Sequence, residues 1–508
     1  MLQRSLWHGC SSVRGFSSAG ARLPADKNKH RRYNGEAIAT SGLSSTTLTA
    51  RNMFKLFRQL FDQVDASSLA VFRIGFGALL IFDSVNQFFL CMPCKYLEPP
   101  MLFKYRYFEW IDPWPGVGLY VHWSVLTVCA IAIMIGYRYR LALFIFTLGF
   151  SYAFLLDEAL YLNHYYMVIL FCVIMLFVPA NAYLSLDARR DASIASRTIP
   201  RWAIIVLIVQ LEIILIHAGL VKLNPDWLNL EPLRMWMHNS RPDFPPFFTT
   251  LTNDIGIALG AYGAVLLHLV GAPLLLFRKT RLWVLGVYFV FHVMNHFVFN
   301  IGIFPWFTLF ASTLFLDPDW PKKLVRRFTK KPVTLIATEK YSYSFGFKQQ
   351  AVLVVMLSWI LLQVAVPFRN WMLPGNVAWN EDGHRFSWRM KLRSKRGTAI
   401  YTIKADGQQW RVNPGDYLTR KQHRKMVCIP DMLLQFANFL DEEWQRKGHT
   451  PDSVSVATSC ALNGRPRQVM VDPNRNLLQV GRDQLASEWI LPLTTQLPKR
   501  KISLKQSG

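Results

Sequence analysis

The stretch AIIVLIVQLEIILIHAGLV at residues 203–221 decides the fold class, and Lys222 follows it directly. Its apolar character is interrupted mainly by Gln210, Glu212 and His217. The stretch is long enough to cross the hydrocarbon layer of a bilayer as one helix. An ammonium group at the edge of that layer is costly unless it is paired, hydrated or neutral. Lys222 is therefore either a free amine that acts as a base or a cation that reaches outward to the lipid headgroups.

The composition is typical of a multi-pass membrane protein. Hydrophobic residues make up 52% and aromatic residues 14% of the 508 residues, which is more apolar sequence than one soluble domain needs. Segments of roughly spanning length occur at 69–91, 115–136, 139–160, 164–182, 202–222, 255–277, 282–301, 303–316 and 350–368. Residues 303–316 are short for a span. We therefore predict a mainly α-helical bundle of about nine membrane spans.

The formal net charge of +25 is concentrated in alternate loops between these segments. The basic clusters comprise Arg51, Lys55 and Arg58; Arg138 and Arg140; Arg189, Arg190, Arg197 and Arg201; Arg278, Lys279 and Arg281; and Lys322, Lys323, Arg326, Arg327, Lys330 and Lys331. This alternation follows the positive-inside rule, and it argues against nucleic acid as the partner of the basic residues. It predicts a cytoplasmic or matrix N-terminus, with everything after about residue 369 on the opposite side.

Polar residues gather on the face away from the basic loops. They comprise Asp157, Glu158, Asn163 and His164, then 222–227, then 300–305. His292, Asn295 and His296 lie inside the seventh predicted span, where such groups are rare and usually face a cavity or a neighbouring helix. Each of them alone could be a helix-packing contact. Their convergence on one side predicts a site.

Several short blocks of sequence occur on both sides of the last predicted span. In the predicted bundle they are VDASSLA at 64–70, NHY at 163–165, GLVKL at 219–223, FHVMN at 291–295 and IGIF at 301–304. Beyond it they are WN at 379–380, FSWRM at 386–390, NPG at 413–415 and DML at 431–433. These blocks resemble the vitamin K-dependent gamma-glutamyl carboxylase family and its wider HTTM membrane-domain superfamily, and the resemblance covers roughly residues 60–495. The blocks follow the family's order on both sides of the last span, so the match is specific for the carboxylase branch.

The resemblance implies an enzyme that couples oxidation of vitamin K hydroquinone to its epoxide with carboxylation of protein glutamate to gamma-carboxyglutamate. O2 and CO2 are the other substrates, and no metal is implied. A base deprotonates the hydroquinone, oxygen adds, and the strongly basic product removes the γ-proton of the glutamate. A non-carboxylating quinone-binding or quinone-oxidising protein of the same superfamily is the alternative. A transporter is less favoured, because the polar residues mark no path through the bilayer.

The resemblance also implies roles for individual residues. Lys222 matches the family's base, and a desolvated amine loses its proton readily. Asn163 and His164 would complete the catalytic set by orienting and polarising the quinone oxygens. His292 would line the pocket for glutamate and CO2, and together with Asn295 and Trp227 it would form the binding site for the reduced quinone.

The predicted domains are a targeting or disordered segment (1–50), a helical catalytic domain (51–368), a non-cytoplasmic α+β domain (369–495) and a basic tail (496–508). Runs at 387–393, 398–404, 409–412, 454–457 and 468–471 alternate like short strands, and 432–444 reads as a helix. Asp406 and Gly407 form a predicted hairpin turn. This domain would capture a polypeptide substrate over the membrane site, or serve as a lid or assembly surface.

Residues 1–25 are basic and serine-rich and contain no acidic residue, which is typical of a mitochondrial transit peptide. The first span could instead act as a signal anchor. We favour the endoplasmic reticulum membrane, with the mitochondrial inner membrane as the alternative. Expected partners are the lipid bilayer, a glutamate-containing polypeptide and a vitamin K epoxide reductase that recycles the quinone. Animal members of the family extend beyond the position of Gly508, so propeptide recognition stays open.

The cysteines add little to these predictions. Cys91 and Cys94 form an isolated Cys-x-x-Cys without a second pair, so we expect no zinc site there. Cys428 and Cys460 could pair in an oxidising compartment.

Overall fold

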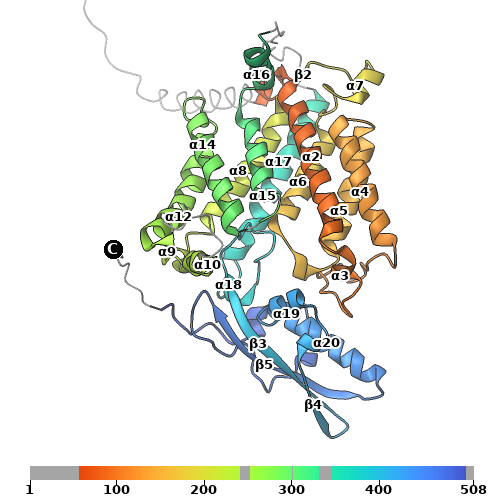
Figure 1. Cartoon of the computed structure of the whole chain (residues 1–508), viewed down its shortest axis with the longest axis vertical. Coiled ribbons are helices and arrows are strands. Elements are labelled where there is room, and N and C mark those ends of the chain that lie inside the picture. Colours follow the sequence, from red (N-terminus) through yellow and green to blue (C-terminus); the bar gives the residue numbers. More distant parts are fainter. Residues whose placement is uncertain (1–56, 241–251, 300, 331–345, 499–508) are drawn as a thin grey trace, which may run out of the picture. The chain divides into compact units, whose positions relative to one another are not determined.

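The computed structural model in Figure 1 describes residues 57–240, 252–299, 301–330 and 346–498. The predicted targeting segment, Asn300 and most of the predicted basic tail lie outside the described residues. The main helices are α2 (Ser67–Phe89), α4 (Gly118–Ile135), α5 (Tyr139–Leu155), α6 (Asn163–Phe177), α8 (Trp202–Leu220), α12 (Asp254–Leu266), α14 (Arg281–Phe299), α15 (Phe304–Ser312) and α17 (Phe347–Phe368). Each coincides with one predicted apolar segment.

Shorter elements connect these helices. They are β1 (Gln63–Asp65), α3 (Met92–Tyr96), η1 (Glu158–Leu160), α7 (Leu186–Arg190), β2 (Thr198–Pro200), α9 (Pro225–Leu228), α10 (Leu233–Ser240), η4 (Leu267–Gly271), α13 (Ala272–Leu274), η5 (Thr313–Phe315) and α16 (Trp320–Thr329). β1 and β2 pair antiparallel, with Val64 opposite Ile199.

Within the described residues, six helices are long and apolar enough to cross a membrane: α2, α4, α8, α12 with its continuation to Leu274, α14 and α17 with its extension to Trp371. The apolar helices at 139–155, 163–177 and 304–315 are shorter. The structure therefore supports a polytopic membrane protein, and the count of about nine spans stays a prediction.

Two predicted spans were too long. The segment predicted at 139–160 ends as a helix at Leu155, because Asp157 accepts a hydrogen bond from the backbone N–H of Ala159 and begins η1. The segment predicted at 164–182 ends as a helix at Phe177, two residues before Pro179, whose missing N–H and fixed φ do not suit a helix interior.

The basic loops meet at one end of the helical part. Asp187 accepts hydrogen bonds from the backbone N–H groups of Arg138 and Tyr139. Asp317 lies 2.5 Å from Arg278, and Lys322 lies 2.6 Å from Asp65. In Figure 1 this end carries α7, β2 and α16, whereas the strands of the C-terminal region lie at the other end. The arrangement agrees with the alternation of charge along the sequence.

This arrangement predicts the outcome of glycosylation mapping. An acceptor site introduced beside Gln408, in the C-terminal hairpin, should be glycosylated in a microsomal translation system. A matched acceptor site beside Lys323, in α16, should not be, because it lies at the basic end. Modification at Lys323 but not at Gln408 would reverse the predicted orientation.

Aromatic side chains from helices far apart in sequence form the centre of the helical part. The Phe72 ring of α2 lies 6.0 Å from Phe171 of α6 and 5.9 Å from Phe310 of α15. Phe76 lies 5.3 Å from Phe307. Helices in a bilayer associate by such close packing, and this core holds the residues of α6 beside those of α15.

The C-terminal region contains β3 (Lys395–Ala405), β4 (Gln408–Val412) and β5 (Pro451–Leu462) in the antiparallel order β4-β3-β5. Its helices are η6 (Arg369–Trp371), α18 (Val377–Asn380), η7 (Pro414–Asp416), α19 (Arg420–Met426), α20 (Pro430–Arg446), η8 (Leu477–Gln479) and α21 (Ala486–Trp489). Tyr401 of β3 and Phe436 of α20 pack in its core, with ring centres 5.0 Å apart. A disulfide joins Cys428 to Cys460.

The hairpin at Asp406 and Gly407 is confirmed, and both residues have positive φ, as this tight turn requires. The strand predicted at 387–393 was wrong. Phe386, Trp388 and Lys391 all have positive φ, which breaks an extended backbone, and Trp388 is fully buried. The run at 468–471 forms only an isolated bridge between Gln468 and Cys460.

Candidate active site

A cavity of about 1710 Å³ lies between the helices and the C-terminal region. One part of its wall is apolar and comes mainly from α12 and α14, with Leu259, Val287, Val290, Met294, Val298 and Phe299. Polar residues from the start of α6, from the segment after α8 and from the C-terminal region line much of the rest. Five of the six predicted site residues line this cavity: Asn163, His164, Lys222, Trp227 and Asn295.

Lys222 lies two residues beyond the end of α8 and faces the cavity. Its side chain is buried, and Nζ donates a 2.7 Å hydrogen bond to the carbonyl oxygen of Ala218. Nζ lies 5.5 Å from the centre of the Trp227 ring. Burial lowers the pKa of Lys222 to about 8. Among the residues that the structure describes, no carboxylate forms an ion pair with this amine, so it can give up its proton near neutral pH.

Gly219 allows a second ionisable group to approach Lys222. A Cβ at Gly219 would lie 2.9 Å from the Cβ of His268 and 2.7 Å from Leu269, so only glycine lets η4 pack this closely on α8. His268 lines the cavity, is buried, and places Nδ1 2.7 Å from the carbonyl oxygen of Ala264. Nε2 of His268 is therefore the ring nitrogen that remains available to bind a neighbouring group.

The segment after Lys222 is tied to the C-terminal region. Asp226 is buried, and its two carboxylate oxygens lie 2.6 and 2.7 Å from the guanidinium nitrogens of Arg465. Asn463 donates a further hydrogen bond of 2.7 Å to Asp226. Trp227, the next residue, donates its indole N–H to the carbonyl oxygen of Ala261 in α12. The conformation of this segment therefore depends on residues at the end of β5.

Asn163 and His164 are the first two residues of α6, where backbone N–H groups remain without helical partners. Asn163 Oδ1 lies 3.0 Å from the hydroxyl of Tyr161, which also lines the cavity. The His164 ring packs edge-on against Tyr165, with ring centres 4.8 Å apart. The start of α6 thus presents an amide, an imidazole and a helix N-terminus to the cavity.

His292 is placed differently from the other predicted site residues. It is buried behind two cavity-lining rings, those of Phe291 and Phe304, at ring-centre distances of 5.2 and 6.0 Å. Its ring also stacks on Tyr288 at 5.8 Å. Neither ring nitrogen has a hydrogen-bond partner among the described residues. His292 therefore lies behind the cavity wall and supports it.

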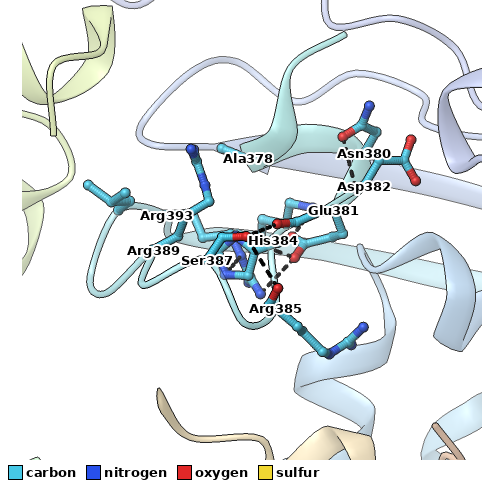
Figure 2. A network of polar contacts seen from close by, with 12 residues as sticks. Ala378, Asn380, Glu381, Asp382, His384, Arg385, Ser387, Arg389 and Arg393 are labelled. Carbon is cyan, nitrogen blue, oxygen red and sulfur yellow. Dashed lines mark hydrogen bonds and ion pairs between the residues drawn. The ribbon is translucent and has the colours of Figure 1, made fainter. Parts of the chain in front are cut away.

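The C-terminal wall of the cavity is strongly basic. It carries Arg385, Lys391, Arg393, Lys395, Arg396, Arg424 and Lys425. Figure 2 shows how part of this group is held in place. Glu381 lies 2.6 Å from Lys395 and 2.8 Å from Arg393, while Arg385 pairs with Glu158 beside the start of α6. Among the described residues, the carboxylates that line the cavity are Asp83 and Glu158, which are outnumbered by the basic side chains, so its charge favours anions.

Burial alone would raise the pKa of Glu381, but Arg393 and Lys395 outweigh burial and hold that pKa below its usual range. Burial, reinforced by Arg393, lowers the pKa of His384 well below its usual value. His384 is therefore neutral and accepts a hydrogen bond of 3.1 Å from the side chain of Arg393. This network holds the basic side chains in fixed positions without neutralising most of them.

Two family models match the chain. The HTTM domain matches residues 61–320, and the lumenal domain of vitamin K-dependent gamma-carboxylase matches residues 348–496. The chain belongs to the vitamin K-dependent gamma-glutamyl carboxylase family. Membership of this carboxylase family implies the use of vitamin K and a glutamate-containing protein substrate. No solved structure matches the chain.

The cavity combines a large apolar wall with a few polar groups. A quinone with an apolar tail needs a large apolar wall and a few polar groups at one end. Residues of α12 and α14 form the apolar wall of this cavity, and its polar groups include Asn163, His164 and Lys222. The basic C-terminal wall adds a region that suits the carboxylates of a substrate polypeptide.

Several residues that line the cavity are not among the residues predicted from the sequence. His268, like His292, is an ionisable residue inside an apolar segment. That pattern would have been enough to predict it as a site residue. Tyr161 and the basic residues of the C-terminal wall carried no such signal, because only the tertiary structure brings them to the cavity.

Proposed function

We propose that the protein is a vitamin K-dependent gamma-glutamyl carboxylase that oxidises vitamin K hydroquinone to the epoxide and carboxylates glutamate. The observation that carries the proposal is one cavity with a buried lysine amine, an apolar wall and a basic wall. For each turnover, hydroquinone, O2, CO2 and a glutamyl residue give epoxide, water, a gamma-carboxyglutamyl residue and one proton.

Lys222 is the proposed base for the first step. In its neutral form the amine takes the proton from a hydroxyl of the hydroquinone, and its burial keeps competing water away. Vitamin K hydroquinone supplies the chemistry with O2 that drives removal of the glutamate γ-proton. Asn163 and His164 bind the quinone oxygens and stabilise the negative charge that develops when Lys222 takes the proton. Trp227 and Asn295 complete the proposed quinone site.

The glutamate is proposed to enter from the C-terminal wall. Arg385, Arg393 and Lys395 line this side of the cavity, and guanidinium groups bind carboxylates in two-pronged geometry. The wall would hold the side-chain carboxylate of the target while its γ-carbon faces the quinone. His292 would act from behind Phe291 and Phe304, beside the place where CO2 is captured.

The proposed location is the endoplasmic reticulum membrane, with a helical domain over residues 51–368 and a lumenal domain over residues 369–495. The disulfide between Cys428 and Cys460 and that between Cys91 and Cys94 support an oxidising compartment on that side. A vitamin K epoxide reductase would return the epoxide to the hydroquinone.

A direct assay tests this function. Purified full-length protein in nanodiscs receives reduced vitamin K, an acidic glutamate peptide and labelled bicarbonate. We expect both label in the peptide and quinone epoxide, and no label in a matched peptide with glutamine in place of glutamate. Epoxide without labelled peptide would support the non-carboxylating quinone oxidase instead. The absence of both products would reject the proposed reaction.

A further inference from the structure

A chain of two hydrogen bonds connects the C-terminal region to Asn163. The backbone N–H of Phe386 donates to the hydroxyl oxygen of Tyr161 over 2.8 Å. The Tyr161 hydroxyl lies 3.0 Å from Asn163 Oδ1. Phe386 and Tyr161 are 225 residues apart in the sequence, so only the tertiary structure creates this connection.

The chemistry of the donors fixes the direction of the chain. A backbone N–H can only donate, so the Tyr161 oxygen accepts from Phe386 and its hydroxyl hydrogen is free for Asn163. Only the carbonyl oxygen of the Asn163 amide can accept that hydrogen. The NH2 group of Asn163 is then left to face the cavity. In this arrangement the Tyr161 hydroxyl accepts from Phe386 and donates to Asn163 Oδ1, so both of its roles are used.

The neighbours of Phe386 hold the start of this chain. Its ring packs edge-on against Tyr161 at 5.5 Å and against Tyr166 at 4.9 Å. Next to it, Arg385 forms an ion pair with Glu158 of η1, and its carbonyl oxygen accepts a hydrogen bond from Arg369. Phe386 is therefore fixed against both η1 and the end of α17, and Tyr161 receives its hydrogen bond from a rigid group.

We propose that Tyr161 is a positioning residue that locks Asn163 as a hydrogen-bond donor toward a substrate oxygen. The proposal rests on the proposed function, in which that oxygen becomes negative once Lys222 takes its proton. An amide that pointed its own oxygen into the cavity would repel this charge. The C-terminal region thus shapes the reaction centre as well as receiving the polypeptide.

A double-mutant cycle tests the proposal. Tyr161→Phe removes the hydroxyl and keeps the ring, so the Asn163 amide is free to turn. We expect kcat for epoxide formation to fall about ten-fold with little change in KM, because the lost hydrogen bond strengthens as charge develops. In an Asn163→Ala background, Tyr161→Phe should have no further effect. An equal loss in both backgrounds would show a merely structural role and overturn the proposal.

Tyr166→Phe is the matched control. Its ring also packs on Phe386, and within the described part of the chain its hydroxyl makes no hydrogen bond. This variant should keep kcat within about two-fold of the wild type. A loss as large as that of Tyr161→Phe would show that removing any tyrosine hydroxyl beside Phe386 lowers kcat, and it would refute the proposal.

Hydrogen exchange separates failure of this proposal from failure of the proposed function. The peptide containing Phe386 should exchange faster in Tyr161→Phe than in the wild type, whether or not the protein turns over. Unchanged exchange would rule out the Tyr161 hydrogen bond. If the wild type forms no product, the proposed function alone fails. The double-mutant cycle is then repeated with affinity for reduced vitamin K as the measured quantity, and it decides whether Tyr161 acts through Asn163.

Discussion

Replacing Lys222 with alanine should abolish epoxide formation and glutamate carboxylation together. In the proposed reaction both products depend on one initial deprotonation, and the buried amine beside the Trp227 ring is the proposed base. The loss should reach at least about 100-fold, the usual contribution of a positioned general base. Binding of reduced vitamin K should survive, because the apolar wall and Asn163 remain. Product formation and quinone affinity are measured on the same preparation.

Lys222→Arg distinguishes a base from an interfacial cation. A guanidinium keeps the positive charge but does not give up its proton in a protein, so this variant should fail almost as completely as Lys222→Ala. If Lys222 only reached outward to the headgroups, arginine would replace it with little loss. Lys279→Arg, an exposed substitution in a basic loop, serves as the control and should retain activity. Full activity in Lys222→Arg would remove the residue from the mechanism.

The pH dependence gives a second measure of the same role. Burial lowers the pKa of Lys222 to about 8, and only the neutral amine accepts a proton. The value of kcat/KM should therefore rise about ten-fold per pH unit below pH 8 and level off above it. A small exogenous amine should partly restore Lys222→Ala. A profile that falls between pH 7 and pH 8 would contradict a neutral amine as the base.

The second large effect is expected at Asp226, which joins the Lys222 segment to the end of β5. Both Asp226 and Arg465 have side chains only 9% exposed. Replacing Asp226 with asparagine would leave the guanidinium buried without its carboxylate, at a cost of about 3 to 5 kcal/mol. The segment 222–227 would also lose its anchor, so turnover should fall with stability. Thermal unfolding of the purified protein and the epoxide assay measure the two effects.

A double substitution shows whether the ion pair itself is responsible. Asp226→Leu combined with Arg465→Met removes both charges, and it should cost less stability than the sum of the two single changes. Arg467→Met is the matched control, since Arg467 is exposed and close in sequence, and it should change the melting temperature little. Strict additivity of the two single effects would indicate that Asp226 and Arg465 do not act as a pair.

The positions of the helices could be predicted from the sequence because apolar length is a local property. A helix that crosses a bilayer needs about 20 apolar residues, and each predicted segment overlaps one of the described helices. The ends of the segments were less predictable. The short helix η1 depends on the Asp157 carboxylate, which accepts hydrogen bonds from Phe103 and Gln422 as well as Ala159. Such distant contacts leave no local pattern.

In the C-terminal region, too, the sequence predicts local structure but not structure that depends on distant contacts. Alternation predicted β3 and β4 with their turn, because pairing within a hairpin is local. It wrongly predicted a strand at 387–393, since Trp388 is buried by packing on Tyr166 of α6, with ring centres 5.1 Å apart. The backbone conformation at 387–393 is therefore set by packing against a distant helix and not by the alternation of apolar and polar residues.

The sequence by itself determined that the chain is a membrane protein of the carboxylase family, and it placed Lys222 at the end of an apolar segment. Those conclusions follow from apolar length, charge alternation and short motifs, all of which are read along the chain. Only the tertiary structure decided that the Lys222 amine is buried against a cavity. The reason is that its surroundings come from η4, α12 and the end of β5, which meet the Lys222 segment only when the chain has folded.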